Sequence, residues 1–287
     1  MPKKPQPKRE GIMLAYPMDT GKLRRLGKTA IVQPKLNGER CRIEWFRDDP
    51  VLLSSYNNPF EFCSHIKKAL VDLYHQMGIR YSFDGELYHH GWPFSRIHSA
   101  ASCTVNYNPD NEGLQLHIFD LQIQKPQEGR SKDLMALAED IGSEYSGALE
   151  FVPTHYLPTS DWELAANHWV DRGYEGIILR KLDGSYVPKR TVEMLKFKPT
   201  EPDEYTIMQV LEAISKDFEP KGMVGAFLVM DTDGNTFKVG AGKLKHPERI
   251  DLWKNREHLI GRKLVVKHEK LKTSGGVPVC AVAVKVL

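Results

Sequence analysis

The sequence lacks any long apolar segment, and this absence limits where the protein can act. No hydrophobic run approaches the roughly 20 residues that a membrane-spanning helix needs. The first nine residues are basic and rich in proline, and no apolar segment follows them, which excludes a secretory signal peptide. We therefore expect a cytoplasmic protein without membrane contact, and a disordered arm over residues 1–10.

Cysteine is also scarce, and neither sign of charge is in large excess. The four cysteines have no metal-ligand spacing, which predicts free thiols in a reducing compartment. The net charge of +3 is too small to indicate nucleic-acid binding by itself. Residues 238–287, however, hold twelve Lys or Arg and only four Asp or Glu. This local excess fits phosphate contacts, and it fits a solvated basic surface equally well.

Length and pattern indicate two domains. A chain of 287 residues is long enough for two, and prolines at 199 and 202 mark a linker over residues 199–204. Before the linker, helices and strands are mixed. After it, about five short strands and one helix predict a small β-barrel of the OB type. We therefore place the boundary at residues 200 and 201.

Hydrophobic periodicity predicts the main elements. Helices are expected over residues 60–77, ended by Gly78, over 131–141 with Ser131 as cap, and from a capping box at 160–163 to near Gly173. Strands are expected at residues 51–53, 81–88, 114–121, 176–179 and 191–197. In the second domain they are expected at 225–230 and 236–239, around an Asp-Gly turn, and at 264–266 and 277–286, with a helix opening at 246.

One lysine stands out by its setting. Lys35 lies on a short turn bracketed by Pro34 and Gly38, and an alternating strand follows with Arg40 on its polar face. A deprotonated lysine held in this way can attack phosphorus. A solvated lysine in a hairpin loop fits the octapeptide at residues 33–40 as well.

Other polar positions fall on predicted strands. Asp84 and Glu86 share a strand face, where two close carboxylates repel unless they bind a cation or a ligand. Lys196 and Lys198 share another face and suit a triphosphate. Glu175 precedes a buried strand, where a carboxylate can hold Mg²⁺. Each pattern alone also fits an ordinary surface or turn.

Taken together and in order, these motifs resemble the ATP-dependent DNA ligases, which belong to the covalent nucleotidyltransferases together with mRNA capping enzymes. The motifs are KLNGER at 35–40, FDGE at 83–86, HIFD at 117–120, EGII at 175–178 and LKFK at 195–198. IMLA at 12–15 and FKVG at 237–240 add weaker matches. The resemblance implies an α+β fold, with an adenylation domain of antiparallel sheets and flanking helices followed by an OB-fold domain.

The resemblance also implies a reaction and its reactants. Such an enzyme seals 3′-OH/5′-phosphate nicks in duplex DNA with ATP and Mg²⁺ or Mn²⁺, through a lysyl-AMP and a DNA-adenylate. The chain is similar in size to the minimal ligases of phages and bacteria, and we expect a monomer for which no protein partner is inferred.

The resemblance gives each site residue a role. Lys35 takes the AMP. The remaining nucleotide contacts come from Gln33 at the adenine edge, Phe119 on the adenine face, Arg40 and Glu86 at the ribose or nucleotide, and Lys196 and Lys198 at the phosphates. Glu175 and Glu86 hold the metal. DNA contacts come from Arg40, Asn37, Lys238 and Lys243.

Three positions depart from the family pattern. Asn37 stands where the family usually has Asp, which removes a negative charge beside the nucleophile. Ser55 stands where an arginine is usual, so one contact to the nick phosphate is expected to be missing. Residues 276–280 lack the aromatic and basic residues of the last motif, and Lys285 is the candidate substitute.

Two alternatives remain open from the sequence. An RNA ligase or an mRNA capping guanylyltransferase uses the same lysine chemistry. A non-catalytic nucleic-acid-binding module could also be built on the barrel and its basic residues, although the ordered lysine and glutamate motifs argue against it.

Overall fold

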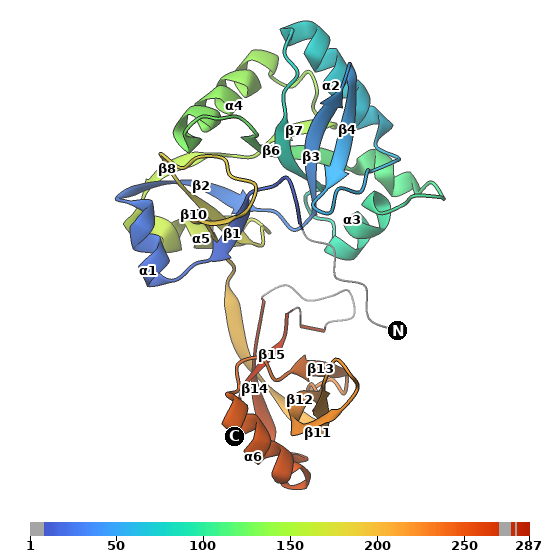
Figure 1. Ribbon diagram of the computed structural model, residues 1–287, viewed down its shortest axis with the longest axis vertical. Coiled ribbons are helices and arrows are strands. Elements are labelled where there is room, and N and C mark those ends of the chain that lie inside the picture. The colour runs from blue at the N-terminus through green and yellow to red at the C-terminus, as the bar shows by residue number, and fades with distance from the viewer. Residues whose placement is uncertain (1–8, 270–276, 279) are drawn as a thin grey trace. The chain divides into compact units, whose positions relative to one another are not determined.

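The computed structural model describes residues 9–269, 277–278 and 280–287, and the chain divides into two compact units, Met1–Phe197 and Lys198–Leu287 (Figure 1). Most of the predicted disordered arm, and positions 276 and 279 of the last motif, lie outside the described residues. Among the helices of the described ranges, none has the length and apolar character that a membrane span requires. Cys41, Cys63 and Cys103 are free thiols.

The first sheet of unit 1 carries Lys35 at the end of one of its strands, and residues 36–38 form the turn that follows, here called the lysine turn. Its strand order is β1-β10-β9-β2-β8. The bounds are β1 Leu14–Pro17, β2 Thr29–Lys35, β8 His155–Pro158, β9 Gly176–Lys181 and β10 Arg190–Phe197. Helices α1 (Thr20–Leu23) and α5 (Trp162–Val170) and the 3₁₀ turns η1 (Arg24–Leu26) and η3 (Thr159–Asp161) flank it. Because side chains alternate along a strand, Ala30 and Val32 of β2 pack in the core with Trp169 of α5, while Gln33 and Lys35 face the other way.

The second sheet of unit 1 has the order β4-β3-β5-β6-β7. Its strands are β3 Glu39–Phe46, β4 Asp49–Ser54, β5 Phe83–Tyr88, β6 Gln115–Leu121 and β7 Leu149–Phe151. Helices α2 (Ser64–Met77), α3 (Phe94–Ala101) and α4 (Gln127–Ile141) flank it (Figure 1). These helices supply apolar side chains to its core, and η2 spans Pro109–Gly113. Cys41 and Ile43 of β3 point into this core, so Arg40 and Arg42 take the opposite face, as the alternation predicts.

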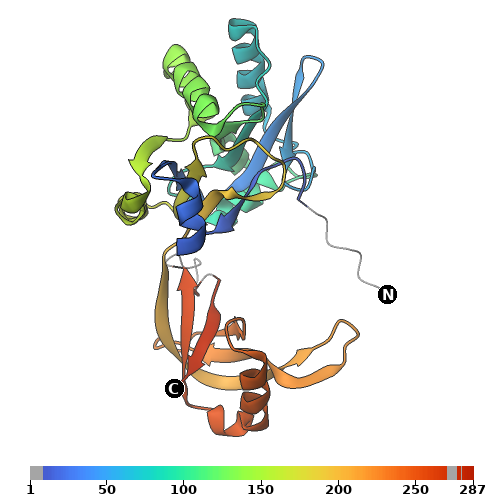
Figure 2. The same ribbon diagram turned by 60° about the vertical axis from the view of Figure 1, so that its left-hand side comes forward.

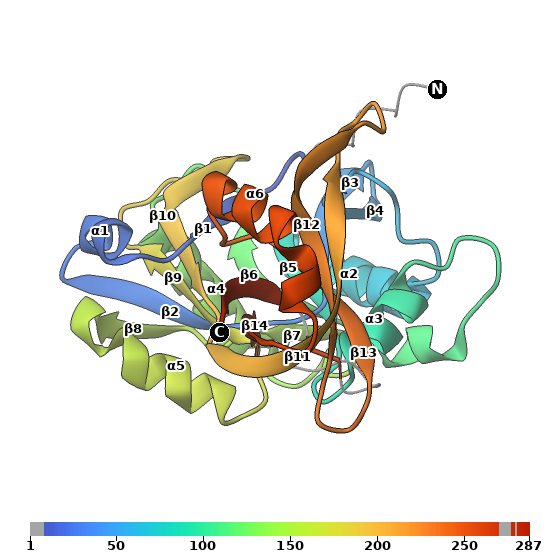
Figure 3. The same cartoon turned by 90° about the horizontal axis from the view of Figure 1, so that it is seen from below.

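Unit 2 is a closed five-stranded barrel with the order β11-β12-β13-β15-β14. Its elements are β11 Thr200–Ile214, β12 Pro220–Met230, β13 Thr236–Gly240, α6 His246–Lys254, η4 Arg256–Leu259, β14 Lys263–Glu269 and β15 Val282–Val286. The predicted Asp-Gly turn joins β12 to β13, with Gly234 at φ 86°. The β11–β12 hairpin extends away from the barrel wall (Figure 2), and α6 lies beside β12 (Figure 3).

The prediction of a linker over residues 199–204 is wrong, because residues 200–204 form the first part of strand β11. Pro202 pairs with Lys267 of β14, while β12 joins β11 only from Thr206 onward. A proline cannot donate a ladder hydrogen bond, so it is tolerated where only one side of the strand is paired. Pro199 therefore directly precedes a barrel strand, and Pro202 lies within its first residues.

Three helix starts differ from their predictions. Helix α2 begins at Ser64, four residues after the predicted start, although Gly78 ends it in the left-handed conformation as expected. Helix α4 begins at Gln127 directly after Pro126, and Ser131 lies buried inside it instead of capping it. The capping box at 160–163 does not form, because residues 159–161 are a 3₁₀ turn and Asp161 makes no side-chain cap.

Candidate active site

Lys35 is the last residue of β2, and the neighbouring strand β9 holds it in place. The backbone N–H of Glu175 donates to the carbonyl oxygen of Lys35 (3.0 Å), immediately before β9 begins. The side-chain amine of Lys35 forms an ion pair with the Glu175 carboxylate and donates to the carbonyl oxygen of Leu36 (3.0 Å). The amine is therefore fixed at the end of the strand instead of extending into solvent.

A second carboxylate, Glu86 of β5, lies near the same amine. Its Oε1 accepts the backbone N–H of Gly38 at 2.6 Å, which ties the lysine turn to the second sheet. A Cβ at position 38 would lie 2.3 Å from the Leu87 carbonyl oxygen, so only glycine allows this approach. Burial raises the pKa of Glu86, Lys35 opposes this shift, and the nearby negative charge of Glu175 adds to it.

Arg40 is held by Asp84, across the two strands β3 and β5. Arg40 Nε donates to Asp84 Oδ1 at 2.7 Å, and Arg40 Nη2 donates to the other oxygen of the carboxylate. The hydroxyl of Tyr186 also donates to Asp84 (2.7 Å). Burial alone would lower the pKa of Arg40, but the Asp84 carboxylate raises it above its usual value. The sequence pattern predicted that Asp84 and Glu86 bind a cation or a ligand. For Asp84, this cation is the side chain of Arg40.

Gln33 and Phe119 lie together where the two sheets of unit 1 meet. Gln33 is buried, and its Nε2 donates to the Phe119 carbonyl oxygen and to Thr154 Oγ1, each at 3.0 Å. The Phe119 ring is also buried, with the guanidinium carbons of Arg40 and Arg180 at 4.6 Å and 5.4 Å from its centroid. The structure therefore brings the two predicted base contacts together and surrounds them with arginines.

A buried charge network behind Gln33 was missed by the sequence analysis. Asp120 accepts from Arg130 Nε (2.7 Å) and from Arg180 Nη1 (2.6 Å), and all three side chains are almost fully buried. Gln127 joins them, because its Oε1 accepts from both arginines. The available signal was a charged residue on the same face as an apolar one in an otherwise apolar strand, such as Arg180 two residues after Ile178 of β9.

Lys196 faces the site, and Lys198 belongs to the other unit. In the strand register, both Lys196 and Gln33 lie opposite Ile178, which places all three on the face that bears Lys35. Lys198 begins unit 2, where its amine donates to Glu269 Oε1 at 3.0 Å.

The predicted DNA contacts are accessible to different degrees. Asn37 is partly buried on the lysine turn, and its side chain makes no hydrogen bond with the residues that the structure describes. Lys238 and Lys243 are exposed on the barrel, as is Lys285 of β15. The three lysine side chains are therefore accessible to a polyanion.

The carboxylates near Lys35 supply only some of the oxygen atoms that a metal ion needs. Within the described residues, no three His, Cys, Asp or Glu side chains form a cluster that could hold a metal ion. Mg²⁺, however, commonly uses one or two carboxylates and takes its other oxygens from water and substrate phosphates. Glu86 and Glu175 supply hard oxygen donors of this kind.

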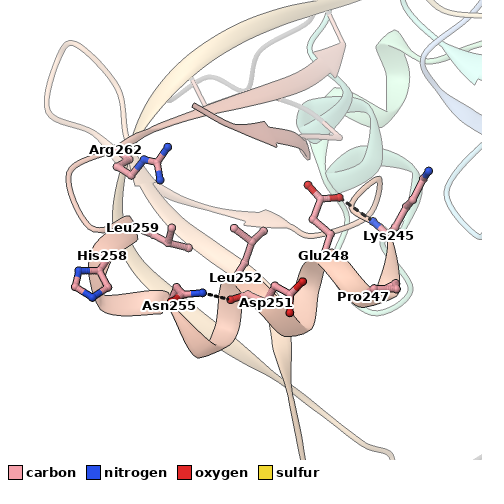
Figure 4. A pocket seen from close by; sticks show the side chains of 9 residues that line it. All are labelled: Lys245, Pro247, Glu248, Asp251, Leu252, Asn255, His258, Leu259 and Arg262. Atoms are coloured by element: carbon pink, nitrogen blue, oxygen red, sulfur yellow. Dashed lines mark hydrogen bonds between the residues drawn. The ribbon is translucent and has the colours of Figure 1, made fainter.

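The barrel unit carries a separate hollow of about 650 Å³ beside α6 and η4 (Figure 4). Leu252 and Leu259 form its apolar floor, and its other lining residues are polar, charged or proline. None of these residues is one that the sequence assigned to the active site.

Comparison with known proteins identifies the family. The family model described as "ATP dependent DNA ligase domain" matches residues 12–198. A DNA ligase of African swine fever virus (isolate Tick/South Africa/Pretoriuskop Pr4/1996) is 28% identical over 273 residues, which are 88% of this chain and 62% of that protein. The chain thus spans less than two thirds of the length of this curated relative.

Solved structures show that the fold is shared. The structure "Pmar-Lig_PreS3" has a TM-score of 0.82 at 20% identity, covering 96% of this chain and 67% of that one. A structure of Lig E DNA ligases, described as DNA binding with a minimal scaffold, has a TM-score of 0.76 at 21% identity, covering 96% and 99%. With most of unit 1 matched by the family model, the chain belongs to the ATP-dependent DNA ligase family.

Proposed function

We propose that this chain is a DNA ligase that seals 3′-OH/5′-phosphate nicks in duplex DNA with ATP. The observation that carries the proposal is the position of the Lys35 amine, held at the end of β2 beside the carboxylates of Glu175 and Glu86. An amine fixed among charged groups in this way suits phosphoryl-type transfer, which depends on positioning and charge neutralisation.

In the first step, the Lys35 ammonium group loses a proton, and the neutral amine attacks the α-phosphorus of ATP. A second proton leaves the nitrogen as the phosphoramidate forms. A P–N bond forms, the bond to the β-phosphate oxygen breaks, and pyrophosphate leaves. Gln33 and Phe119 contact the adenine in this proposal. The ribose and phosphates are contacted by Arg40, Glu86, Lys196 and Lys198.

In the later steps, AMP passes to the 5′-phosphate of the nick, and the 3′-OH then displaces it. Arg40 and Asn37 contact the nick, and the exposed Lys238 and Lys243 contact the DNA backbone. We further propose that the barrel is an OB-fold domain, that residues 1–200 and 201–287 act as separate domains, and that the enzyme works as a cytoplasmic monomer.

A divalent cation, Mg²⁺ or Mn²⁺, would be held by Glu175 and Glu86. When bound, it neutralises charge on the phosphates that react. The chain's own cations, Lys196 above all, share that task on the same face of the first sheet.

Labelled ATP tests the proposal. Incubation with ATP and Mg²⁺ should give an acid-labile, base-stable protein–AMP adduct, and addition of nicked duplex DNA should discharge it into a sealed product. Labelling by GTP instead would favour a capping guanylyltransferase, and sealing of RNA only would favour an RNA ligase. The absence of any adduct would favour a non-catalytic nucleic-acid-binding module.

A further inference from the structure

The imidazole of His268, near the end of β14, has one ring nitrogen without a hydrogen-bond partner. Its Nδ1 lies 2.8 Å from the carbonyl oxygen of Glu269, and because a carbonyl oxygen only accepts, Nδ1 carries the hydrogen. The other nitrogen, Nε2, is buried and makes no hydrogen bond with the described part of the chain. His268 is only 3% exposed, so bulk water does not satisfy this nitrogen.

The carboxylate of Asp203, on β11, lies close to the unpaired nitrogen. Its Oδ2 is 4.0 Å from His268 Nε2, which is too long for a hydrogen bond. The carboxylate has partners of its own, because Oδ1 accepts the backbone N–H of Glu204 (2.8 Å) and Oδ2 accepts the hydroxyl of Tyr205 (3.0 Å). These two hydrogen bonds hold the carboxylate near the imidazole without closing the space between them.

The pairing of β11 with β14 places a second carboxylate on the same side of the strands. Glu201 lies directly opposite His268 in the ladder, and Asp203 lies opposite Val266. Paired residues point to the same side of a sheet, and residues two apart on a strand share a face. Glu201, Asp203 and His268 therefore belong to one face of this strand pair.

We propose that His268 and Asp203 form a site for a divalent transition-metal ion such as Zn²⁺. Zinc lies about 2.0–2.1 Å from a histidine nitrogen and about 2.0–2.2 Å from a carboxylate oxygen, so one ion can contact both atoms after a small movement of Asp203. A metal-ligating histidine usually donates its other N–H to a carbonyl or carboxylate, as His268 does to Glu269. Water fills the remaining coordination positions, and Glu201 is on the face from which a third side chain can bind.

This pair suits a different metal from the one proposed beside Lys35. Imidazole nitrogen suits Zn²⁺, Cu²⁺ and Ni²⁺, whereas Mg²⁺ takes oxygen ligands. The two ligands also belong to unit 2, while Glu86 and Glu175 belong to unit 1. The ion would join the first residues of β11 to the end of β14, and the inference does not depend on the proposed ligase reaction.

Zinc binding to the full chain tests the site. Titration with Zn²⁺ is followed by calorimetry in excess Mg²⁺, for the wild type and for Asp203→Asn and His268→Gln. The matched controls are Glu204→Gln, an exposed acid next to Asp203 on the opposite face of β11, and His246→Gln, an exposed histidine of the same unit. A parallel titration with Co²⁺ is followed by absorption, because a thiolate ligand such as the exposed Cys280 adds a charge-transfer band.

We expect saturable Zn²⁺ binding by the wild type and a cobalt spectrum without a thiolate band. Asp203→Asn and His268→Gln should each weaken the Zn²⁺ affinity by at least about tenfold, a loss that follows even when an outer partner of a metal ligand is removed. The two controls should bind as the wild type does. Because an ion that binds only the folded chain stabilises it, Zn²⁺ should raise the unfolding temperature of the wild type more than that of Asp203→Asn.

Several results would overturn the inference. The wild type might show no saturable binding, or the controls might lose as much affinity as the two ligand variants. A thiolate band in the cobalt spectrum would place the metal at a cysteine instead. If His268→Gln fails to fold, Asp203→Asn decides, because the Asp203 side chain is 52% exposed and its replacement leaves the packing of the barrel unchanged. An unchanged Zn²⁺ affinity in Asp203→Asn then excludes the site.

Discussion

Glu175 holds Lys35 twice, through its backbone N–H at 3.0 Å from the lysine carbonyl oxygen and through an ion pair between the side chains. The two residues are 140 positions apart in the chain, yet the antiparallel pairing of β2 with β9 brings the end of one strand beside the start of the other. The positions of the proposed nucleophile, Lys35, and of a carboxylate proposed to bind metal, Glu175, are thus set by one strand register.

Replacing the nucleophile should stop the first step and spare the last. Lys35→Ala is expected to form no protein–AMP adduct and to lose ATP-dependent sealing, because no other amine replaces the one held at the end of β2. It should still seal a nick that is already adenylylated. Lys28→Ala, on the exposed approach to the same strand, serves as the control and should form the adduct normally. An adduct that persists in Lys35→Ala would disprove the assignment.

The side chain at position 37 should determine the concentration of divalent metal that nick sealing needs. Asn37→Asp adds a negative charge on the turn that follows Lys35 and that Glu86 contacts at Gly38, so the metal concentration for half-maximal sealing should fall. Asn37→Ala removes a donor and an acceptor and should slow the final sealing step by about tenfold to a hundredfold. Metal titrations, with DNA-adenylate measured on gels, test both effects. If neither variant changes these quantities, Asn37 is only a turn residue.

The exposed barrel lysines should contribute a salt-dependent part of DNA binding. The double variant Lys238→Gln/Lys243→Gln removes two phosphate contacts in our proposal, so the slope of log affinity against log salt should become shallower by about 2. The matched control, Lys216→Gln/Lys221→Gln, removes two lysines from the β11–β12 hairpin, whose neighbouring charges are acidic. Equal changes in the two double variants would show a general charge effect and no local contact.

His117 should make stability depend on pH. Burial, together with the nearby His90 and His89, lowers the pKa of His117 from 6.5 to about 4. The unfolded chain therefore binds a proton that the folded chain does not between these values. Stability from this group is complete above pH 6.5 and falls by at most about 3 kcal/mol as pH drops toward 4. Urea unfolding of His117→Gln should show a shallower pH slope over that window, and an unchanged slope would contradict the assignment.

The tip of the β11–β12 hairpin should be stabilised by a smaller polar residue. Phe218 is 80% exposed and adopts φ 65°, a conformation that disfavours bulky side chains. Ser215 Oγ accepts the N–H groups of Asp217 and Glu219, which holds the turn independently of position 218. Phe218→Asn should therefore raise the free energy of unfolding by about 1 kcal/mol. Val105→Asn, at another highly exposed apolar residue, should not, and denaturant unfolding compares the two.

Local alternation was enough to predict much of the site. The faces of β3, β5 and β10 follow from apolar and polar residues at every second position, so Arg40, Glu86 and Lys196 were assigned to polar faces from the sequence alone. Lys35 was predicted to lie on a turn, but it is the last residue of strand β2. Strands β12, β13 and β14 and the Asp-Gly hairpin were predicted for the same reason, since the signal lies within a few neighbouring residues. Strand β11 was missed.

Only the tertiary structure decided which charges meet. Arg40 binds Asp84 at 44 positions' distance, and Arg180 binds Gln33 at 147, so no spacing rule connects either pair. Pro202, one of two prolines that predicted a linker, lies in a barrel strand because only one side of that strand is paired there. The sequence by itself determined the strand faces and the order of the motifs. Strand register and the packing between sheets decided which polar side chains pair, because both depend on segments that are far apart in the sequence and pack together away from water.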